Sequence, residues 1–570
     1  MPPPPRDLNI GLATINAKYV HLALAPRYLR NAARAAGFAD TWLREFTLKT
    51  PVEDMAGELE ALVPDVLGFS VYIWNRRETF ALIERLKRRR PELVIVVGGP
   101  EVSFEAGPPT PWIDYVIGGE GELKWVQCLE HIAAGRAPDA ATLARWRHHE
   151  GDLPPLDRPP YLDEDLAGIE HRLAYIETSR GCPYTCSFCL SALDKQVRFF
   201  PDPVLKAEVA RLIGAGARRI KFLDRTFNLR RGRALEWFRY LSAFEGVEFH
   251  FEIVGDLLDE AVLTFLDTVP PGRFQFEIGV QSADPAANAR VGRRQSAETL
   301  LARVARLSAA ERVHIHADLI WGLPGETLAD IQRGFETVLA TRPHELQLGF
   351  LKFLPGAPIR ALIGPHGYRF QDGPPYEVIA HADLPERDVR ALKRFEAAFA
   401  RFYNSGRFRF TLARLLALAP AWELFEALAD EAGRGGPFPR PLALDERLRA
   451  LLACGSRWLP REELVDLLKL DYCFHHRARH VPAFLADGRV KEPPEIRRVR
   501  KRHPGAAVAP FRHEIAWEGG WPRLTPGAAP VWYAFHYPGA ASGYFFRPRV
   551  EPLAPAGVAG ASGRPPAAVA

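Results

Sequence analysis

Three of the six cysteines in this chain, Cys182, Cys186 and Cys189, lie within eight consecutive positions. They belong to the segment SRGCPYTCSFCL, which directly follows a predicted strand and has the spacing C-x3-C-x2-C. Three thiolates on one loop can bind one face of an iron–sulfur cluster, and soft sulfur ligands also suit zinc. A zinc site calls for a fourth Cys or His at short spacing, and none is nearby. The pattern therefore favours a [4Fe–4S] cluster with one open iron over zinc or three unrelated cysteines.

The composition is that of a globular protein, with 570 residues of which 47% are hydrophobic and 25% charged. This length predicts about two to four domains. The net charge of +5 is small, which disfavours a general nucleic-acid binder, because such proteins usually carry a larger basic surplus. No apolar run is long enough for a transmembrane helix, and the start, MPPPPRDLNIG, lacks the charged-then-apolar order of a signal peptide. We therefore expect a cytoplasmic protein without a membrane partner.

Strand-like and helix-like segments alternate through residues 1–140, which predicts a doubly wound α/β domain. Short apolar runs rich in branched residues predict strands at 8–15, 41–48, 65–74, 92–99 and 113–119. Five such βα units favour a Rossmann-like parallel sheet with a flavodoxin-type strand order. Residues 141–172 contain PPLDRPPYLDEDL and are predicted to be a proline-rich linker.

The alternation resumes over residues 173–383. Its six strand–helix units favour a partial (βα)6 barrel of the TIM type over a second open sheet. Residues 384–495 are predicted to form an all-helical domain, and residues 496–570 a tail rich in Pro, Ala and Arg that is partly disordered. The fold class expected is therefore α/β with a helical C-terminal domain.

The cysteine segment, with Phe188 just before the last cysteine, resembles the signature of radical S-adenosylmethionine (SAM) enzymes. The resemblance implies that Cys182, Cys186 and Cys189 are cluster ligands at the catalytic centre and that SAM binds the open iron. An electron from the cluster then cleaves SAM to a 5′-deoxyadenosyl radical, while the protein supplies placement and insulation. The resemblance also implies a reductant such as flavodoxin or ferredoxin as a partner.

The same resemblance assigns a SAM pocket to the carboxyl ends of the predicted barrel strands, where barrel enzymes assemble their sites. The segments that carry it are FLDRTFN, HFEIVGD, FEIGVQS and DLIWGLPGET. The residues assigned to SAM are Phe188, Asp224, Glu252, Gln281, Ser282, Gly322, Pro324 and Gly325. Each is weak alone, because an Asp after a strand, for example, is more often a cap or turn residue.

The predicted N-terminal sheet offers small residues and hydroxyls at the carboxyl ends of its strands, where open sheets bind ligands. The loop after the first strand is NAKYVH instead of G-x-G-x-x-G, which disfavours a dinucleotide site. Two glycine pairs at neighbouring strand ends predict a broad, flat shelf. The residues of this shelf and its surroundings are Ser70, Tyr72, Gly98, Gly99, Ser103, Gly118, Gly119 and Glu120.

GGPEVS and DYVIGGEGE resemble the cobalamin-binding domain that precedes the barrel in one subgroup of radical SAM enzymes, which implies cobalamin on the glycine shelf. The D-x-H-x-x-G motif that supplies an axial histidine in other cobalamin proteins is absent, and His21 lacks that context. We therefore expect cobalamin without a protein histidine on cobalt, and His21 in a capping or surface role. A purely structural domain without a ligand is the alternative.

Residues 384–495 resemble an uncharacterised helical domain that follows the barrel in some of these proteins. The resemblances together imply a cobalamin-dependent radical SAM enzyme that passes a methyl group from SAM through cobalamin to an unactivated carbon of a small-molecule substrate. A radical cyclisation or rearrangement, as in anaerobic magnesium-protoporphyrin monomethyl ester cyclase, is a second hypothesis. A cofactor-binding sensor without turnover is a third.

Overall fold

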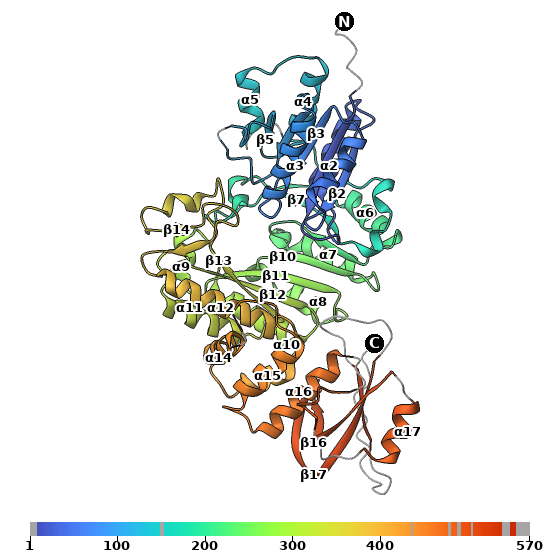
Figure 1. Ribbon diagram of the computed structural model, residues 1–570, viewed down its shortest axis with the longest axis vertical. Helices are drawn as coiled ribbons and strands as arrows, with labels where there is room; N and C mark the ends of the chain where they lie inside the picture. The colour runs from blue at the N-terminus through green and yellow to red at the C-terminus, as the bar shows by residue number, and fades with distance from the viewer. Residues whose placement is uncertain are drawn as a thin grey trace.

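The computed structural model describes residues 8–105, 107–148, 153–434, 436, 438–476, 480–486, 492–502, 505–537 and 548–553. Three parts follow one another along its long axis (Figure 1): an N-terminal α/β domain in blue, a barrel in green and yellow, and a C-terminal region in orange and red. Within the described ranges, no helix has both the length and the apolar composition needed to cross a membrane.

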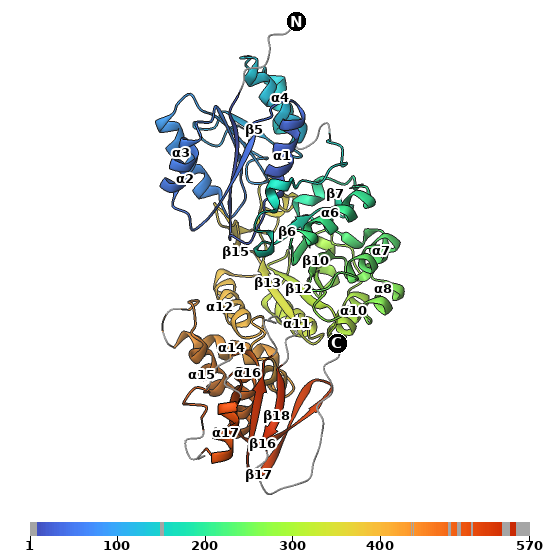
Figure 2. The same cartoon turned by 90° about the vertical axis from the view of Figure 1, so that its right-hand side faces the viewer.

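The N-terminal domain is a five-stranded parallel sheet in the order β2-β1-β3-β4-β5, which confirms the doubly wound, flavodoxin-type prediction. Its strands are β1 (Ile10–Asn16), β2 (Trp42–Thr47), β3 (Val66–Ser70), β4 (Val94–Gly98) and β5 (Tyr115–Ile117). Its main helices are α1 (Leu24–Ala35), α2 (Val52–Ala61), α3 (Arg76–Arg89) and α4 (Glu122–Ala133). Helices α2 and α3 cover one face of the sheet and α1 and α4 the other (Figure 2). Every residue of β1 and β3 is therefore buried, as expected for a sheet covered on both faces.

The described residues of the predicted linker, 141–148 and 153–172, are docked onto the N-terminal domain. Helix α5 (Ala140–Arg147) packs beside β5, where the Gly118 amide donates to the Trp146 carbonyl at 2.8 Å. Further along, the buried Asp165 carboxylate accepts hydrogen bonds from Arg27 and Arg30 of α1. These ion pairs could not be predicted from the proline-rich composition of the segment, because they depend on residues far away in the sequence.

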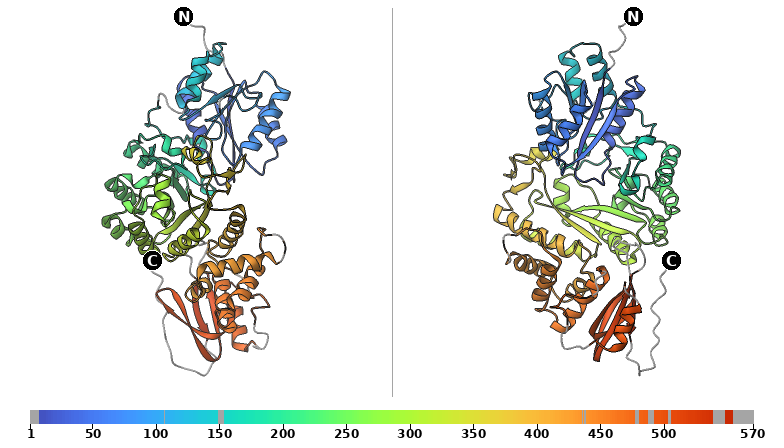
Figure 3. Two further views of the ribbon diagram at one scale, coloured as in Figure 1. Left: turned by 90° about the vertical axis from the view of Figure 1, so that its left-hand side faces the viewer. Right: turned by 45° about the vertical axis from the view of Figure 1, so that its right-hand side comes forward.

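The barrel is a six-stranded parallel sheet in the order β13-β12-β11-β10-β9-β6, which confirms the predicted partial barrel. Its strands are β6 (Ala174–Ile176), β9 (Arg219–Phe222), β10 (Glu248–Ile253), β11 (Phe274–Gln281), β12 (His314–Trp321) and β13 (Glu345–Phe350). The helices between them are α6 (Asp202–Gly214), α7 (Arg231–Ser242), α8 (Glu260–Leu266), α9 (Pro285–Arg290), α10 (Ala297–Ala310) and α11 (Leu328–Leu339). Two short antiparallel pairs lie beside it, β7 (Ser179–Arg180) with β8 (Arg198–Phe199) and β14 (Arg369–Phe370) with β15 (Val378–Ala380). The six strands form an open arc, which Figure 3 shows in its right-hand view.

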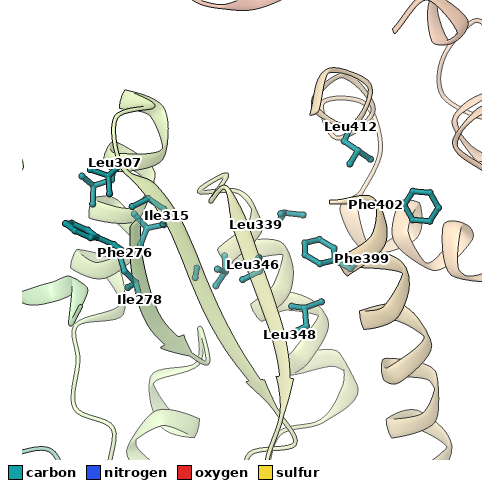
Figure 4. Close-up of a cluster of buried hydrophobic side chains, with 14 of the residues drawn as sticks. Phe276, Ile278, Leu307, Ile315, Leu339, Leu346, Leu348, Phe399, Phe402 and Leu412 are labelled. Carbon is teal, nitrogen blue, oxygen red and sulfur yellow. The ribbon is translucent and has the colours of Figure 1, made fainter. Parts of the chain in front are cut away.

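The barrel strands alternate between a buried and a partly exposed residue at nearly every step. In β10, β11 and β12 the outward-facing residues, such as Phe251, Phe276 and Ala317, are fully buried. Figure 4 shows this outer layer, in which Phe276 and Ile315 pack beside Leu307 of α10, and Leu346 and Leu348 of β13 face helix α12 (Glu386–Phe402). The inward-facing residues are mostly polar and partly exposed.

The C-terminal region confirms the helical prediction with α12 (Glu386–Phe402), α13 (Arg409–Leu415), α14 (Ala421–Gly433), α15 (Leu444–Gly455) and α16 (Arg461–His475), followed by α17 (Pro494–Arg502). It also holds an antiparallel sheet that the sequence did not predict, made of β16 (Ala507–Glu518), β17 (Trp521–His536) and β18 (Arg549–Leu553). Prolines 522 and 526 of β17 lie where it pairs with β16 alone, which is the position that strands tolerate for proline. Part of the predicted tail is therefore folded, and residues 554–570 lie outside the described residues.

Candidate active site

The three clustered cysteines line one pocket with residues from the carboxyl ends of β10 and β11. Cys182 and Cys186 are buried and Cys189 is partly exposed. The other residues that line the pocket are Tyr184, Phe188, Ser191, Ala192, Arg225, Thr226, Glu252, Ile253, Val254, Glu277, Gly279, Gln281, Arg293 and Asp318. Of the residues predicted to bind SAM, the structure thus brings Phe188, Glu252 and Gln281 together with the cysteines.

Backbone hydrogen bonds hold the cysteine loop in place. The Cys182 amide donates to the Asp194 carbonyl at 2.8 Å, and the Cys189 amide donates to the Cys186 carbonyl at 3.0 Å. Gly181 has a φ of +91°, and a Cβ there would lie 2.3 Å from the Gln196 carbonyl oxygen. Only glycine fits this close approach, which sets the direction in which the chain enters the loop.

The cysteines suit an iron–sulfur cluster by ligand type, because such clusters are held by cysteine thiolates. All three line the same pocket. The remaining cysteines, Cys128, Cys454 and Cys473, are buried elsewhere and do not line the pocket.

Asp224 is fully buried beneath the cysteine loop and is not among the pocket-lining residues. Its carboxylate accepts hydrogen bonds from the Thr178 amide at 2.8 Å and from the Thr178 and Ser179 hydroxyls at 2.6 Å. Burial raises the pKa of Asp224, although these hydrogen bonds oppose the increase. The structure therefore places Asp224 as a support for the segment that leads to Cys182, a role that the sequence pattern did not distinguish from SAM contact.

A β-bulge at the end of β11 changes the direction of the Gln281 side chain. The pairing register of β11 with β12 shifts between Gly279 and Gln281, and Gln281 has a φ of +67°. A Cβ on Gly279 would lie 2.2 Å from the Gln281 Nε2 atom, so the side chain folds back over the glycine. Its buried Oε1 has no hydrogen-bond partner among the described residues. Bulges and strained backbone of this kind gather at binding sites, and the free amide oxygen is available to a ligand in the pocket.

The other predicted SAM residues do not line the pocket; these are Ser282, Gly322, Pro324 and Gly325. The Ser282 hydroxyl donates to the Glu326 carboxylate at 2.6 Å, which ties the end of β11 to the loop after β12. Both glycines have positive φ, +86° for Gly322 and +75° for Gly325. The loop that contains them is therefore shaped by its own backbone, and their predicted contact with SAM stays a prediction.

Charged side chains form a row along the inner face of the barrel sheet, next to the pocket. The Glu277 carboxylate lies 3.0 Å from Lys221 Nζ and 2.9 Å from His250 Nε2. Burial alone would raise the pKa of Glu277, but these two partners outweigh burial and hold it well below its ordinary value. On the next strand, His316 lies 3.3 Å from Asp318, and this carboxylate helps to raise the pKa of His316 against the effect of burial.

The carboxyl edge of the N-terminal sheet presents aromatic surface near the barrel. Tyr72 stacks on Trp74 with 4.4 Å between ring centroids and 4° between planes, and Trp74 is 45% exposed. Burial raises the pKa of Tyr72, and the barrel residues Arg225 and Glu177 are close enough to act on it electrostatically. Ser70 is buried at the end of β3, where its carbonyl accepts a bond from Asn75.

The predicted glycine shelf is packed tightly against its own domain. A Cβ on Gly99 would lie 2.6 Å from the Val71 carbonyl oxygen, and one on Gly118 would lie 2.2 Å from that of Arg147. A Cβ on Gly98 would lie 3.1 Å from the Ile117 carbonyl oxygen. The Ser103 hydroxyl donates to the Gly99 carbonyl at 2.8 Å. Small residues are required here by neighbouring backbone, whether or not a ligand lies above them.

Glu120, predicted to contact cobalamin, joins the two domains. Its carboxylate binds Arg180 at 2.5 Å and also pairs with Arg198, both of which belong to the barrel. Arg180 stands two residues before Cys182 and pairs as well with Glu122 and Glu177, each at 2.7 Å. The loop after β5 is thus bound directly to the segment that carries the first cysteine.

His21 is also a domain contact, which differs from its expected capping or surface role. Its Nδ1 lies 2.7 Å from the Tyr175 hydroxyl of β6, and its backbone forms a β-bridge with Leu173. Burial and nearby cations lower its pKa. The histidine ring is held by the barrel, on the same edge of the domain as the aromatic pair.

Three family models match consecutive parts of the chain. The B12 binding domain matches residues 10–128, the Radical SAM superfamily matches residues 176–338, and a protein of unknown function, DUF4080, matches residues 364–504. The match to the radical SAM family thus follows the match to the B12-binding family along the chain. The expected cofactor set of a [4Fe–4S] cluster, SAM and cobalamin is confirmed at the level of the domains that bind them.

The chain is similar to two curated methyltransferases. It is 29% identical over 349 residues to the cobalamin-dependent radical SAM methyltransferase TokK of Streptomyces tokunonensis. The aligned region covers 55% of this chain and 50% of TokK. It is 25% identical over 378 residues to 2-(S-pantetheinyl)-carbapenam-3-carboxylate methyltransferase of Streptantibioticus cattleyicolor, with 60% of this chain and 54% of that protein covered. The chain spans about half the length of the curated relatives it matches.

Solved structures share the fold of much of this chain. The cobalamin-dependent SAM radical enzyme OxsB with aqua-cobalamin bound matches with a TM-score of 0.55 and 14% identity, over 86% of this chain and 83% of OxsB. The radical SAM methyltransferase TsrM of Kitasatospora setae matches with a TM-score of 0.51 and 18% identity, over 64% of this chain and 78% of TsrM. At these identities the likeness concerns the fold.

Several residues of the radical SAM pocket escaped the sequence interpretation. Arg225, Thr226, Arg293 and Asp318 all line the pocket beside the cysteines. For Asp318 a signal existed, because HIHADLIW alternates polar and apolar residues and so indicates a strand with one hydrated face. Arg293 gave no such signal, because it follows helix α9 and reaches the pocket through the fold of the loop.

Proposed function

We propose that this protein is a cobalamin-dependent radical SAM methyltransferase that transfers a methyl group from SAM to an unactivated carbon of a small-molecule substrate. The observation that supports this proposal most directly is the ion pair between Arg180 and Glu120. It joins the segment that carries Cys182 to the edge of the sheet that matches a B12-binding domain. A cluster on one side and a corrin on the other would therefore face a common space.

The residues present suit these cofactors. Cys182, Cys186 and Cys189 would hold the cluster, and Gln281 offers a free amide oxygen to SAM in the same pocket. When bound, the cluster and cobalamin supply electron transfer to SAM and carriage of the methyl group. The chain itself orients SAM against the cysteine loop and excludes water by burying Cys182 and Cys186.

The charges of the pocket support a small polar substrate. Glu252, Glu277 and Asp318 line it together with Arg225 and Arg293. Burial raises the pKa of Glu252, whereas ion pairing keeps Glu277 ionised. A substrate that carries hydrogen-bonding or cationic groups would meet partners here, whereas a polyanion would meet three carboxylates. A protein reductant such as flavodoxin or ferredoxin completes the proposal as the electron donor.

The test uses the full-length protein, reconstituted anaerobically with iron, sulfide and hydroxocobalamin and reduced with dithionite. After addition of SAM with a deuterated methyl group, mass spectrometry should detect 5′-deoxyadenosine and S-adenosylhomocysteine, the product left when SAM donates its methyl group. The Cys186→Ala variant should lose 5′-deoxyadenosine, and the Cys128→Ala variant should retain it.

Each other result points to a different hypothesis. Formation of 5′-deoxyadenosine without S-adenosylhomocysteine would contradict methyl transfer and favour a radical cyclase or rearrangement enzyme. The absence of both products from protein that holds a full cluster and cobalamin would contradict catalysis altogether and favour a cofactor-binding sensor.

A further inference from the structure

Arg293 lies between the cysteine loop and the bulge of β11. Its guanidinium Nη1 lies 3.9 Å from Cys186 Sγ. Its Nη2 donates to the Gly279 carbonyl at 2.9 Å. Its Nε donates to Gln295 at 2.9 Å, and Gln295 in turn donates to the Val280 carbonyl at 2.6 Å. These partners fix the guanidinium in one orientation, so its approach to the sulfur is a positioned contact.

The segment around Arg293 supports the cysteine loop from behind. The Ser187 amide donates to the Val291 carbonyl at 2.8 Å. Gly292 has a φ of +70°, and a Cβ at this position would lie 2.7 Å from the Thr185 carbonyl oxygen. This close packing carries the chain into the pocket at the level of Cys186, and it explains why the arginine of the loop can touch a cysteine 107 residues earlier in the sequence.

The nearby positive charge acts on the sulfur electrostatically. A guanidinium keeps its proton at every accessible pH, so its influence on the sulfur is permanent. The potential of an iron–sulfur cluster depends on net charge, on hydrogen bonds to its sulfurs and on solvent exposure.

We propose that Arg293 is a positioning residue that raises the reduction potential of the cluster by donating to the Cys186 sulfur. The reduced cluster carries one more negative charge than the oxidised cluster, so a fixed cation and N–H donor stabilise the reduced form more. This inference rests on the cluster of the proposed function. It adds a reason why a moderate donor can reduce the cluster.

The test is an anaerobic redox titration of the reconstituted full-length protein, followed by electron paramagnetic resonance and carried out before SAM is added. We expect Arg293→Gln to make the cluster about tenfold harder to reduce, which for a one-electron couple is a decrease of about 59 mV in midpoint potential. Arg293→Lys keeps the charge but cannot make both contacts, so its shift should be smaller. Arg294→Gln is the matched control, because its exposed side chain is the next in sequence and removes the same charge.

Iron and sulfide contents distinguish failure of this proposal from failure of the proposed function. If the wild type holds no cluster, the proposed function fails first. If the cluster is present and Arg293→Gln shifts the potential no more than Arg294→Gln, the redox role of Arg293 is overturned. If both Arg293 variants lose the cluster while Arg294→Gln keeps it, Arg293 holds Cys186 in place and the tuning role is likewise overturned.

Discussion

The two parallel sheets of this protein differ in what covers them. Strands β1, β3 and β4 of the N-terminal sheet contain no ionisable side chain, because helices cover both faces of that sheet. The barrel strands carry charged residues on an inner face that no helix covers, including Lys221, His250 and Glu277. A sheet covered on both faces can act on a ligand only at its edge, whereas the open barrel sheet offers its edge and its face. Four predictions test this contrast.

The largest expected effect separates two cysteines, one in the cysteine loop and one in helix α4 of the N-terminal domain. Cys186→Ala should abolish iron binding and the sulfur-to-iron charge-transfer absorbance of the reconstituted protein, because a three-cysteine cluster cannot form on two ligands. Cys128→Ala should leave both unchanged, because that thiol is fully buried beneath the N-terminal sheet. Loss of the cluster from Cys128→Ala, with circular dichroism showing a folded protein, would contradict the three-ligand assignment.

The second effect concerns the charged inner face. Glu277 has a lowered pKa, so its ionised form stabilises the folded state above its unfolded pKa of about 4.3 and this contribution is lost as the pH falls below that value. We expect Glu277→Gln to destabilise the barrel by on the order of 1–3 kcal/mol at pH 7, with a smaller difference from wild type in acid. Hydrogen exchange of β10 and β11 amides at several pH values measures this locally.

Glu53 is the matched carboxylate outside the barrel. It forms exposed ion pairs with Arg85 and Arg89 on the surface of the N-terminal domain. Exposed pairs of this kind contribute little, so Glu53→Gln should leave the exchange of β1 and β3 amides unchanged across the same pH range. An equal, pH-dependent loss of protection in both variants would remove the distinction between the two sheets.

A third effect tests the tight packing of the glycine shelf. Gly118→Ala places a Cβ against the Arg147 backbone oxygen and should destabilise the N-terminal domain by about 1–3 kcal/mol. Gly57 in α2 has no atom within 4 Å of an added Cβ, so Gly57→Ala should stabilise the helix slightly. Protease sensitivity of this domain, without added cobalamin, ranks the two variants. Equal resistance of the Gly118 variant and wild type would show that the shelf has room to relax.

The smallest effect concerns His21. Because its ring is held by the Tyr175 hydroxyl, His21→Ala should leave the absorption spectrum of bound hydroxocobalamin unchanged. A histidine on cobalt would instead make the spectrum of the variant differ from that of wild type. A spectral change upon substitution, at equal cobalamin content, would contradict binding without a protein histidine.

The sequence predicted those parts of the molecule that depend on neighbouring residues. Spacing and periodicity were sufficient for the alternation of strands and helices, the helical C-terminal region and the cysteine loop, because each follows from a local pattern. The roles of Asp224 and Glu120 were not predictable in this way. Each is set by partners 45–78 positions distant in the sequence, namely Ser179 and Thr178 for Asp224 and Arg180 and Arg198 for Glu120.

Composition misled the prediction for the C-terminal segment. Prolines and glycines in β17 are typical of a disordered tail, yet those in its hairpin arm lie where the strand has a single neighbour. The segment is also anchored from outside, because the buried Asp466 of α16 accepts bonds from the Arg512 and His513 amides at 2.7 and 3.0 Å. No local pattern shows an anchor of this kind.

The contact between Tyr376 and Glu101 has a consequence for the order in which the protein is made. The Tyr376 hydroxyl donates to the Glu101 carboxylate in the loop after β4, although the two residues are 275 positions apart in the chain. The Phe104 ring packs against Gly356, where an added Cβ would lie 2.3 Å from the nearest ring carbons. At 5–20 residues per second, a ribosome needs roughly 14–55 s to synthesise the chain between the first pair. The N-terminal sheet can therefore form before the residues that contact the loop after β4 have been synthesised.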